Sequence, residues 1–206
     1  AECDVSIRPG WFYHASQDDQ VKSVRTLLEI WYASVGRGAN LLLNVPPDRR
    51  GLFHENDVAR LKEFDAALKA IFANDLARGD VLERTPTSVV FAQEVELNRI
   101  VLREDVSLGQ RVEKFRVTTQ TGGIARILAE GTTIGRKRVL RIPATRVRNV
   151  HVVVEKSRAE AQLAGFTRAD VHDYYASRYV PERTIVAIVG AVDPERALAL
   201  ALEAYG

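Results

Sequence analysis

The residues with the densest binding chemistry lie near the start of the chain, in the segment 4–14. This segment contains the carboxylate of Asp4, the guanidinium of Arg8, the indole of Trp11 and the imidazole of His14. The apolar face of a pyranose can stack on an indole while the three polar groups hydrogen-bond to hydroxyls. The sequence therefore predicts a sugar-binding turn. The alternative, which composition alone favours, is that the aromatic side chains fill a hydrophobic core.

Four carboxylates flank or belong to this segment, and a glycosidase needs two acids on opposite sides of the bond it cleaves. They are Glu2, Asp4, Asp18 and Asp19. The alternative interpretation is that Asp18 and Asp19 only stabilise the dipole of the helix that follows. The sequence does not give the separation of these acids, so it assigns no catalytic residue.

The elements that position the segment follow from sequence pattern. Pro9 and Gly10 interrupt regular structure and indicate an irregular turn, since proline fixes φ and glycine tolerates positive φ. Residues 16–19 are typical of a helix start, with apolar residues at helical spacing after them. The apolar run 40–45 predicts a strand buried on both faces, and 55–76 predicts a second helix. We expect a parallel α/β unit whose edges need further partners.

The pattern changes after residue 77. Gly79, Asp80 and the Thr-Pro-Thr run indicate a linker over 78–96. Over 97–160 the apolar residues alternate with a period of two between glycine turns, which favours an antiparallel sandwich or half of one. From residue 165 the pattern predicts a second, incomplete α/β segment ending at residue 206.

Several functions find no support in composition. A net charge of +2 does not indicate nucleic acid binding, and alternation along strands makes the basic residues of 136–148 a solvated sheet face. No apolar run reaches the ~20 residues of a membrane span, and the start has no signal-peptide pattern. His54 lacks a second histidine at zinc-binding spacing, so we expect it at a helix N-terminus and predict no metal or cofactor. The chain contains one cysteine and no methionine, which suggests a piece of something longer.

Three stretches closely resemble the bacterial α-L-fucosidases: residues 2–14, residues 34–36 and the Leu-Leu-Leu-Asn-Val-Pro-Pro-Asp-Arg-Arg-Gly run at 41–51. The resemblance implies that residues 1–77 are the last part of a (β/α)8 barrel, with the opening segment beside the fucoside site. It resumes over 97–112 and 131–135, which look like the second half of a β-sandwich. The first half of that sandwich is expected to be missing, since 78–96 is short.

The resemblance also implies a reaction. The resemblance implies a retaining glycosidase that hydrolyses terminal α-L-fucosides, with an aspartate as nucleophile and a glutamate as acid/base. Both residues are expected before Ala1, so the predicted chain binds a fucosylated glycan or small fucoside through Asp4, Arg8, Trp11 and His14 without cleaving it. The family is often periplasmic or secreted, while the chain itself assigns no location. Missing barrel segments or an oligomer would complete the site.

Residues 165–206 resemble the insulinase-type zinc peptidases instead, without their zinc motif. The predicted fold class is therefore α/β plus β: a partial (β/α)8 barrel segment, an antiparallel β-sandwich-like segment and a short α/β C-terminal segment. Two alternative functions stay open. One is a non-catalytic carbohydrate-binding or interaction module, and the other is a non-catalytic zinc-peptidase-like subunit.

Overall fold

The computed structural model describes residues 1–161 and 163 of the chain. The short α/β segment expected over 165–206 lies outside these residues. The described part contains a two-stranded parallel sheet with helices, followed by a five-stranded antiparallel sheet. This mixed α/β and β composition is the predicted fold class.

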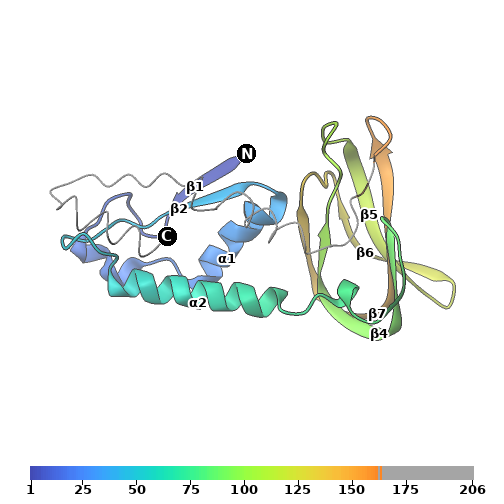
Figure 1. Cartoon of the computed structure of the whole chain (residues 1–206), viewed down its shortest axis with the longest axis horizontal. Helices are drawn as coiled ribbons and strands as arrows, with labels where there is room; N and C mark the ends of the chain where they lie inside the picture. Colours follow the sequence, from blue (N-terminus) through green and yellow to red (C-terminus); the bar gives the residue numbers. More distant parts are fainter. Residues whose placement is uncertain (162, 164–206) are drawn as a thin grey trace, which may run out of the picture. The chain divides into compact units, whose positions relative to one another are not determined.

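The first part of the chain contains two parallel strands (Figure 1). Strand β1 (Glu2–Ser6) pairs with β2 (Asn40–Asn44), with Ser6 opposite Asn44 at the end of the pair. The connection between them consists of the 3-10 helix η1 (Ala15–Gln20), helix α1 (Val24–Ala33) and the 3-10 helix η2 (Val35–Arg37). Helix α2 (Glu55–Phe72) and the 3-10 helix η3 (Leu76–Arg78) follow β2. None of the helices in the described residues is long and apolar enough to cross a membrane.

The helices pack on this parallel pair through a small hydrophobic core. Its fully or nearly fully buried members are Ile7, Leu27 and Phe64, which come from the segment after β1, from α1 and from α2. Trp31 of α1 contacts Phe72 of α2 with a centroid distance of 5.1 Å. Each fully buried side chain of this kind contributes about 1.5–3 kcal/mol, so the core holds the segment after β1 against both helices.

Three expectations for this part are wrong in detail. Residues 16–19 lie in a 3-10 helix, and α1 begins later, after Ser23, whose side chain accepts a hydrogen bond from the Thr26 backbone N–H. Residues 4–6 belong to β1, so the irregular turn begins after Ser6. Strand β2 is not buried on both faces, because Leu42 is 53% exposed. A pair of strands lacks the neighbours that would cover this side chain.

The second sheet has the strand order β3-β4-β7-β5-β6, with every pair antiparallel. The strands are β3 (Val81–Arg84), β4 (Ser88–Leu102), β5 (Val112–Thr121), β6 (Ile124–Gly131) and β7 (Arg138–Ser157). The antiparallel strands expected over 97–160 are confirmed. The two stretches expected at 137–142 and 147–155 form one continuous strand, β7.

The linker predicted over 78–96 is wrong, because this segment contains β3 and the first part of β4. The turn residues that suggested a linker form the connection of a hairpin. The Thr85 backbone N–H donates to the Ser88 carbonyl at 2.9 Å, and the Thr85 hydroxyl accepts from the Ser88 N–H at 3.0 Å. Such local bonds satisfy the backbone of a tight turn between paired strands. The wider division into domains stays a prediction.

Irregularities in pairing let the long strands enclose one core. In β4, the buried side chains change from odd positions, such as Val89 and Phe91, to even positions, such as Ile100 and Leu102. The change coincides with an irregularity in pairing: Leu97 lies opposite Thr145 of β7 and Arg99 lies opposite Arg141, so two residues of β4 span four of β7. Within residues 1–161 and 163, the core is therefore packed by this one sheet and the segments next to it.

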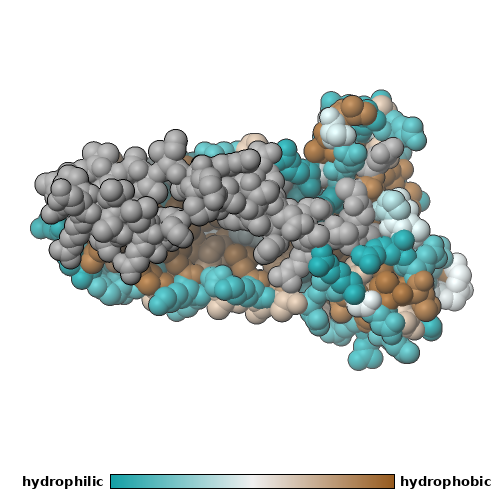
Figure 2. All heavy atoms as spheres, viewed as in Figure 1, coloured by the Kyte–Doolittle hydropathy of each residue, from teal (hydrophilic) through white to brown (hydrophobic). Residues whose placement is uncertain are grey.

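Hydrophobic side chains also remain at the surface of both sheets. Figure 2 shows such side chains among hydrophilic ones over the face in view. On the five-stranded sheet and its loops, the most exposed are Leu82, Leu108, Ile124, Ile127 and Val153. They are spread over different strands and loops, as is usual on protein surfaces, so they define no single docking patch.

Candidate functional site

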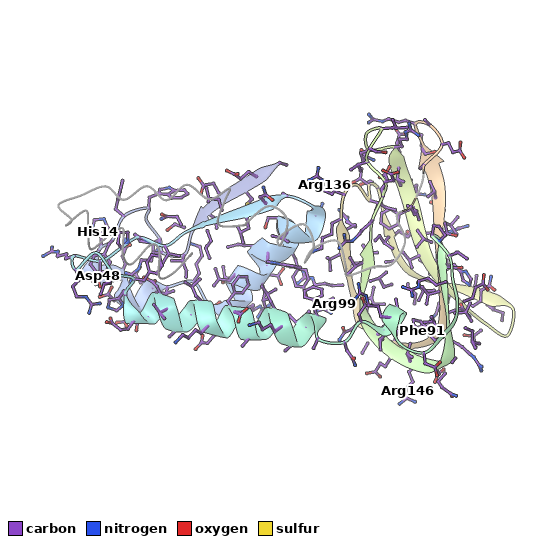
Figure 3. All side chains as sticks on the ribbon, viewed as in Figure 1. His14, Asp48, Phe91, Arg99, Arg136 and Arg146 are labelled. Atoms are coloured by element: carbon purple, nitrogen blue, oxygen red, sulfur yellow. The ribbon has the colours of Figure 1, made fainter. Side chains whose placement is uncertain are left out.

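The candidate site is built from two loops that leave the same edge of the parallel pair. Residues 7–14 follow β1, and residues 45–54 follow β2. Because the strands are parallel, both loops start at the carboxyl ends of their strands, where α/β proteins commonly bind ligands. In Figure 3, His14 of the first loop and Asp48 of the second loop lie at the same end of the two-stranded parallel sheet.

Hydrogen bonds at the strand ends join these loops. The side-chain amide of Asn44 donates to the Trp11 carbonyl at 2.9 Å and to the Ser6 hydroxyl at 3.1 Å. The Ser6 hydroxyl donates to the Gly10 carbonyl at 2.7 Å. Gly10 itself does not have positive φ, so its role here is not the left-handed geometry that its type allows. The turn is therefore fixed from its own strand and from the neighbouring one.

The turn exposes aromatic surface. Trp11 is 50% exposed and Phe12 is 80% exposed, while Tyr13 is half-buried and His14 is exposed. The alternative interpretation, that these aromatic side chains fill a hydrophobic core, is therefore wrong for Trp11 and Phe12. An exposed indole on a turn fixed at several points is suited to stacking on a flat apolar ligand face.

Arg8 lies beneath this turn and is fully buried. Its Nε donates to the Asp57 carboxylate at 2.9 and 3.1 Å, and its Nη1 donates to Asp18 Oδ1 at 2.9 Å. Its Nη2 also lies 2.9 Å from Asp57 Oδ2 but without the angle of a hydrogen bond. Asp57 is fully buried as well. In this structure the Arg8 guanidinium therefore contacts carboxylates and presents no exposed atom to a sugar.

The other two predicted site residues are exposed. Asp4 lies inside β1, opposite Leu42, and not in the turn. By strand alternation it shares a side of β1 with Ser6, whose hydroxyl fixes the turn. His14 directly precedes η1, and its carbonyl accepts from the Gln17 N–H at 2.9 Å. The structure thus brings Trp11 and His14 to the turn and leaves Asp4 within the strand.

A polar cluster beside the turn was not predicted from the sequence. The carboxylate of Asp18 accepts from the Tyr13 hydroxyl at 3.3 Å and lies 3.4 Å from Nε2 of His54. His54 precedes α2, as expected, and its Nδ1 accepts from the Asn56 N–H at 3.2 Å. Neutral His54 therefore carries its proton on Nε2, directed at Asp18. Burial, with the Asp18 charge as the second cause, raises the pKa of Tyr13.

Asp48 organises the second loop in a similar way. Its nearly buried carboxylate accepts from the Arg50 backbone N–H at 2.7 Å and from Arg50 Nε at 2.9 Å. These hydrogen bonds lower the pKa of Asp48, which keeps it ionised. Beyond them, Leu52 and Phe53 are 61% and 52% exposed. The Pro-Pro-Asp-Arg-Arg run was a signal for this loop, although the sequence did not indicate that Asp48 would be buried.

No metal centre is found here: within residues 1–161 and 163, no three histidine, cysteine or acidic side chains gather closely enough to hold an ion. The arrangement instead offers an exposed indole, an exposed imidazole and three further exposed apolar side chains, Phe12, Leu52 and Phe53. Beneath them lies a network of charged groups that satisfy one another. Such a surface binds and orients a small polar ligand with an apolar face.

Comparison with known proteins agrees with this chemistry. Residues 2–71 match the family model of alpha-L-fucosidase. The chain is 36% identical to "Alpha-L-fucosidase 1" of Arabidopsis thaliana over 200 residues, covering 80% of this chain and 39% of that protein. It is 34% identical to "Putative alpha-L-fucosidase 1" of Oryza sativa, covering 81% of this chain and 38% of that protein. The chain thus spans well under half the length of these relatives.

Solved structures give the same result. One from Bacteroides ovatus, of a putative alpha-L-fucosidase, is 36% identical, with a TM-score of 0.72 and coverage of 93% of this chain and 32% of that chain. A Ruminococcus gnavus GH29 fucosidase in complex with fucose is 25% identical, with a TM-score of 0.67 and coverage of 79% and 39%. These matches support the predicted α-L-fucosidase (GH29) family. The relatives are from plants and bacteria, so a bacterial subgroup is not distinguished.

A second family model, the peptidase M16 inactive domain, matches residues 165–206. This is the stretch whose sequence resembles the insulinase-type zinc peptidases. It lies outside the described residues.

Proposed function

We propose that residues 1–77 form one wall of a fucoside-binding site, as the last part of an α-L-fucosidase-like barrel. The observation that carries this proposal is the exposed Trp11 on a turn fixed by Ser6, Asn44 and the buried Arg8. In this proposal Trp11 stacks on the apolar face of a fucosyl group, and the exposed His14 hydrogen-bonds to a hydroxyl. The ligand is a fucosylated glycan or a small fucoside.

In this proposal Arg8 is a positioning residue, whereas its residue type suggested that it would hydrogen-bond to the sugar. Its guanidinium lies 5.0 Å from the centroid of the Tyr13 ring, and it joins the turn to α2 through Asp57. It therefore positions Trp11 and His14 and does not itself contact the sugar. Asp4 contributes only from the strand that leads to the turn, on the side of Ser6.

The parent reaction would be hydrolysis of terminal α-L-fucosides with retention. We propose that the isolated chain binds but does not turn over, with its nucleophile and acid/base expected from barrel segments before Ala1. The two parallel strands with an exposed Leu42 support the idea that further strands complete the sheet. Those strands would come from the rest of a barrel or from another copy.

Binding is tested by titrating the purified chain with methyl α-L-fucoside and following heat and tryptophan fluorescence. We expect weak, millimolar binding that Trp11→Ala weakens about tenfold or more, which corresponds to at least about 1.4 kcal/mol. The control is Leu82→Ala, which removes another exposed hydrophobic side chain, on β3. No heat at high millimolar fucoside, or equal effects of the two substitutions, would refute the binding site.

Turnover is tested separately with an aryl α-L-fucoside. We expect no release of the phenol by the wild-type chain. Release at a rate abolished by Asp4→Ala would contradict the proposal that the chain lacks cleavage chemistry.

A non-catalytic carbohydrate-binding module is the second candidate function, and the same exposed Trp11 favours it. Binding of several unrelated sugars with equal affinity would support this second function over a fucoside site.

A further inference from the structure

A group of basic side chains meets where η2 approaches the start of β7. Arg37 ends η2, and Arg136, Lys137 and Arg138 lead into β7. A Cβ added to Gly38 would lie 3.1 Å from the Lys137 backbone nitrogen and 3.3 Å from Cβ of Arg136. Gly38 also has a φ of 81°, so the chain needs glycine here to bring the two segments this close.

These cations differ from several other basic residues of the sheet, which have acidic partners. Lys114 lies 2.9 Å from Glu155, and Arg141 binds Glu29 through both of its terminal nitrogens. Within the described part of the chain, Arg37, Arg136 and Arg138 form no ion pair, and Lys137 contacts the Trp31 ring, 4.9 Å from its centroid. Among the residues that the structure describes, these charges are therefore gathered without a carboxylate in ion-pair contact.

The electrostatic consequence is visible in two side chains. Burial, with the Arg103 charge as the second cause, lowers the pKa of Lys137 to about 8. Burial and the charge of Arg37 also lower the pKa of Arg138. The cations thus repel one another in a partly desolvated place, and a bound anion would relieve this repulsion. Arg37 and Arg136 are exposed, so an anion can reach them.

We propose that Arg37, Arg136, Lys137 and Arg138 form a binding site for a tetrahedral oxyanion, sulfate or phosphate, either free or carried on a larger ligand. Guanidinium groups match the geometry of such oxyanions, and several cations arriving from two segments favour a multiply charged anion over a carboxylate. The site is independent of the proposed fucoside site, since η2 precedes β2 and the fucoside loops follow β1 and β2.

The test is calorimetric titration of the whole chain with sodium sulfate and with inorganic phosphate, at constant ionic strength held with sodium chloride. We expect saturable binding of sulfate or phosphate that the double variant Arg37→Ser/Arg136→Ser weakens at least about tenfold. Both side chains are exposed, and an unchanged circular dichroism spectrum would show that the variant folds. The control is Arg146→Ser, an exposed arginine at the other end of the sheet from Arg136 (Figure 3).

A second variant tests the geometry with the charges kept. Gly38→Ala separates the two segments and should weaken the same binding, while Gly79→Ala, whose added Cβ meets no atom closer than 3.4 Å, should not. Tighter binding of a sulfated oligosaccharide than of free sulfate would identify a carbohydrate as the carrier. Absence of saturable binding in every titration, or full binding by the double variant, would overturn the proposal.

Discussion

The guanidinium of Arg8 and the carboxylate of Asp57 lie 2.9 Å apart with both side chains fully buried. They are 49 positions apart in the chain and join the turn after β1 to the first turn of α2. Water does not screen this pair, so each charge depends on the other. Asp18 adds a second, partly exposed carboxylate to the same guanidinium.

We therefore predict that Asp57→Ala destabilises the chain by about 3–5 kcal/mol, because it leaves a buried cation with one carboxylate fewer. Urea unfolding followed by tryptophan fluorescence measures this loss. The matched control is Asp65→Ala on the same helix, whose exposed ion pair with Lys69 should be worth no more than about 1 kcal/mol. The double variant Arg8→Met/Asp57→Leu should lose less than Asp57→Ala alone. A larger loss in the double variant would show that the pair is not the cause.

A second prediction concerns Gly131 at the end of β6. It pairs with Phe115 of β5, and a Cβ added to it would lie 2.6 Å from the Phe115 ring, which is fully buried. We expect Gly131→Ala to cost about 1–3 kcal/mol, since the ring has no space to move into. Thermal unfolding measures the change. The smaller side chain of Phe115→Leu should make the added methyl less costly, so equal penalties in both backgrounds would contradict this explanation.

The third prediction concerns pH. The pKa of Lys137 is about 8 in the folded chain, below the value of about 10.5 expected for an unfolded lysine. Between these values the unfolded chain holds a proton that the folded chain has lost, so the free energy of unfolding should rise with pH through this window. Below about pH 8 the lysine is protonated in both states, and its full desolvation penalty remains.

Urea unfolding across this range, in chloride buffer without sulfate or phosphate, measures the slope. Subtracting the Lys137→Met variant isolates the contribution of this lysine from that of other groups that titrate nearby. Lys62→Met, which changes an exposed lysine on α2, should leave the slope as in the wild type. A wild-type slope that Lys137→Met does not reduce would disprove the assignment.

Local pattern was sufficient for some elements. The spacing of Val58, Leu61, Phe64 and Leu68 predicted α2, and the alternation of short apolar runs predicted antiparallel strands. Both are properties of neighbouring residues, which a single sequence contains. The exposed turn at Trp11 was likewise indicated by Pro9 and Gly10.

Features that depend on distant residues could not be predicted in this way. Arg8 looked like a surface ligand because its partner Asp57 lies far along the chain. The hairpin at 85–88 looked like a linker because turn residues are the same in both, and only pairing of β3 with β4 distinguishes them. The change of facing residues in β4 depends on its register against β7, which alternation alone does not contain.

The side-chain amide of Asn44, the last residue of β2, donates to the Ser6 hydroxyl at the end of β1 and to the Trp11 carbonyl in the first loop. As a result, the loops cannot be exchanged one at a time. A graft that imports residues 7–14 from a relative without a matching side chain at position 44 would lose the anchor of the Trp11 carbonyl. Changes of ligand preference in this scaffold should therefore require both loops, together with Ser6 and Asn44, to be transferred as one cassette.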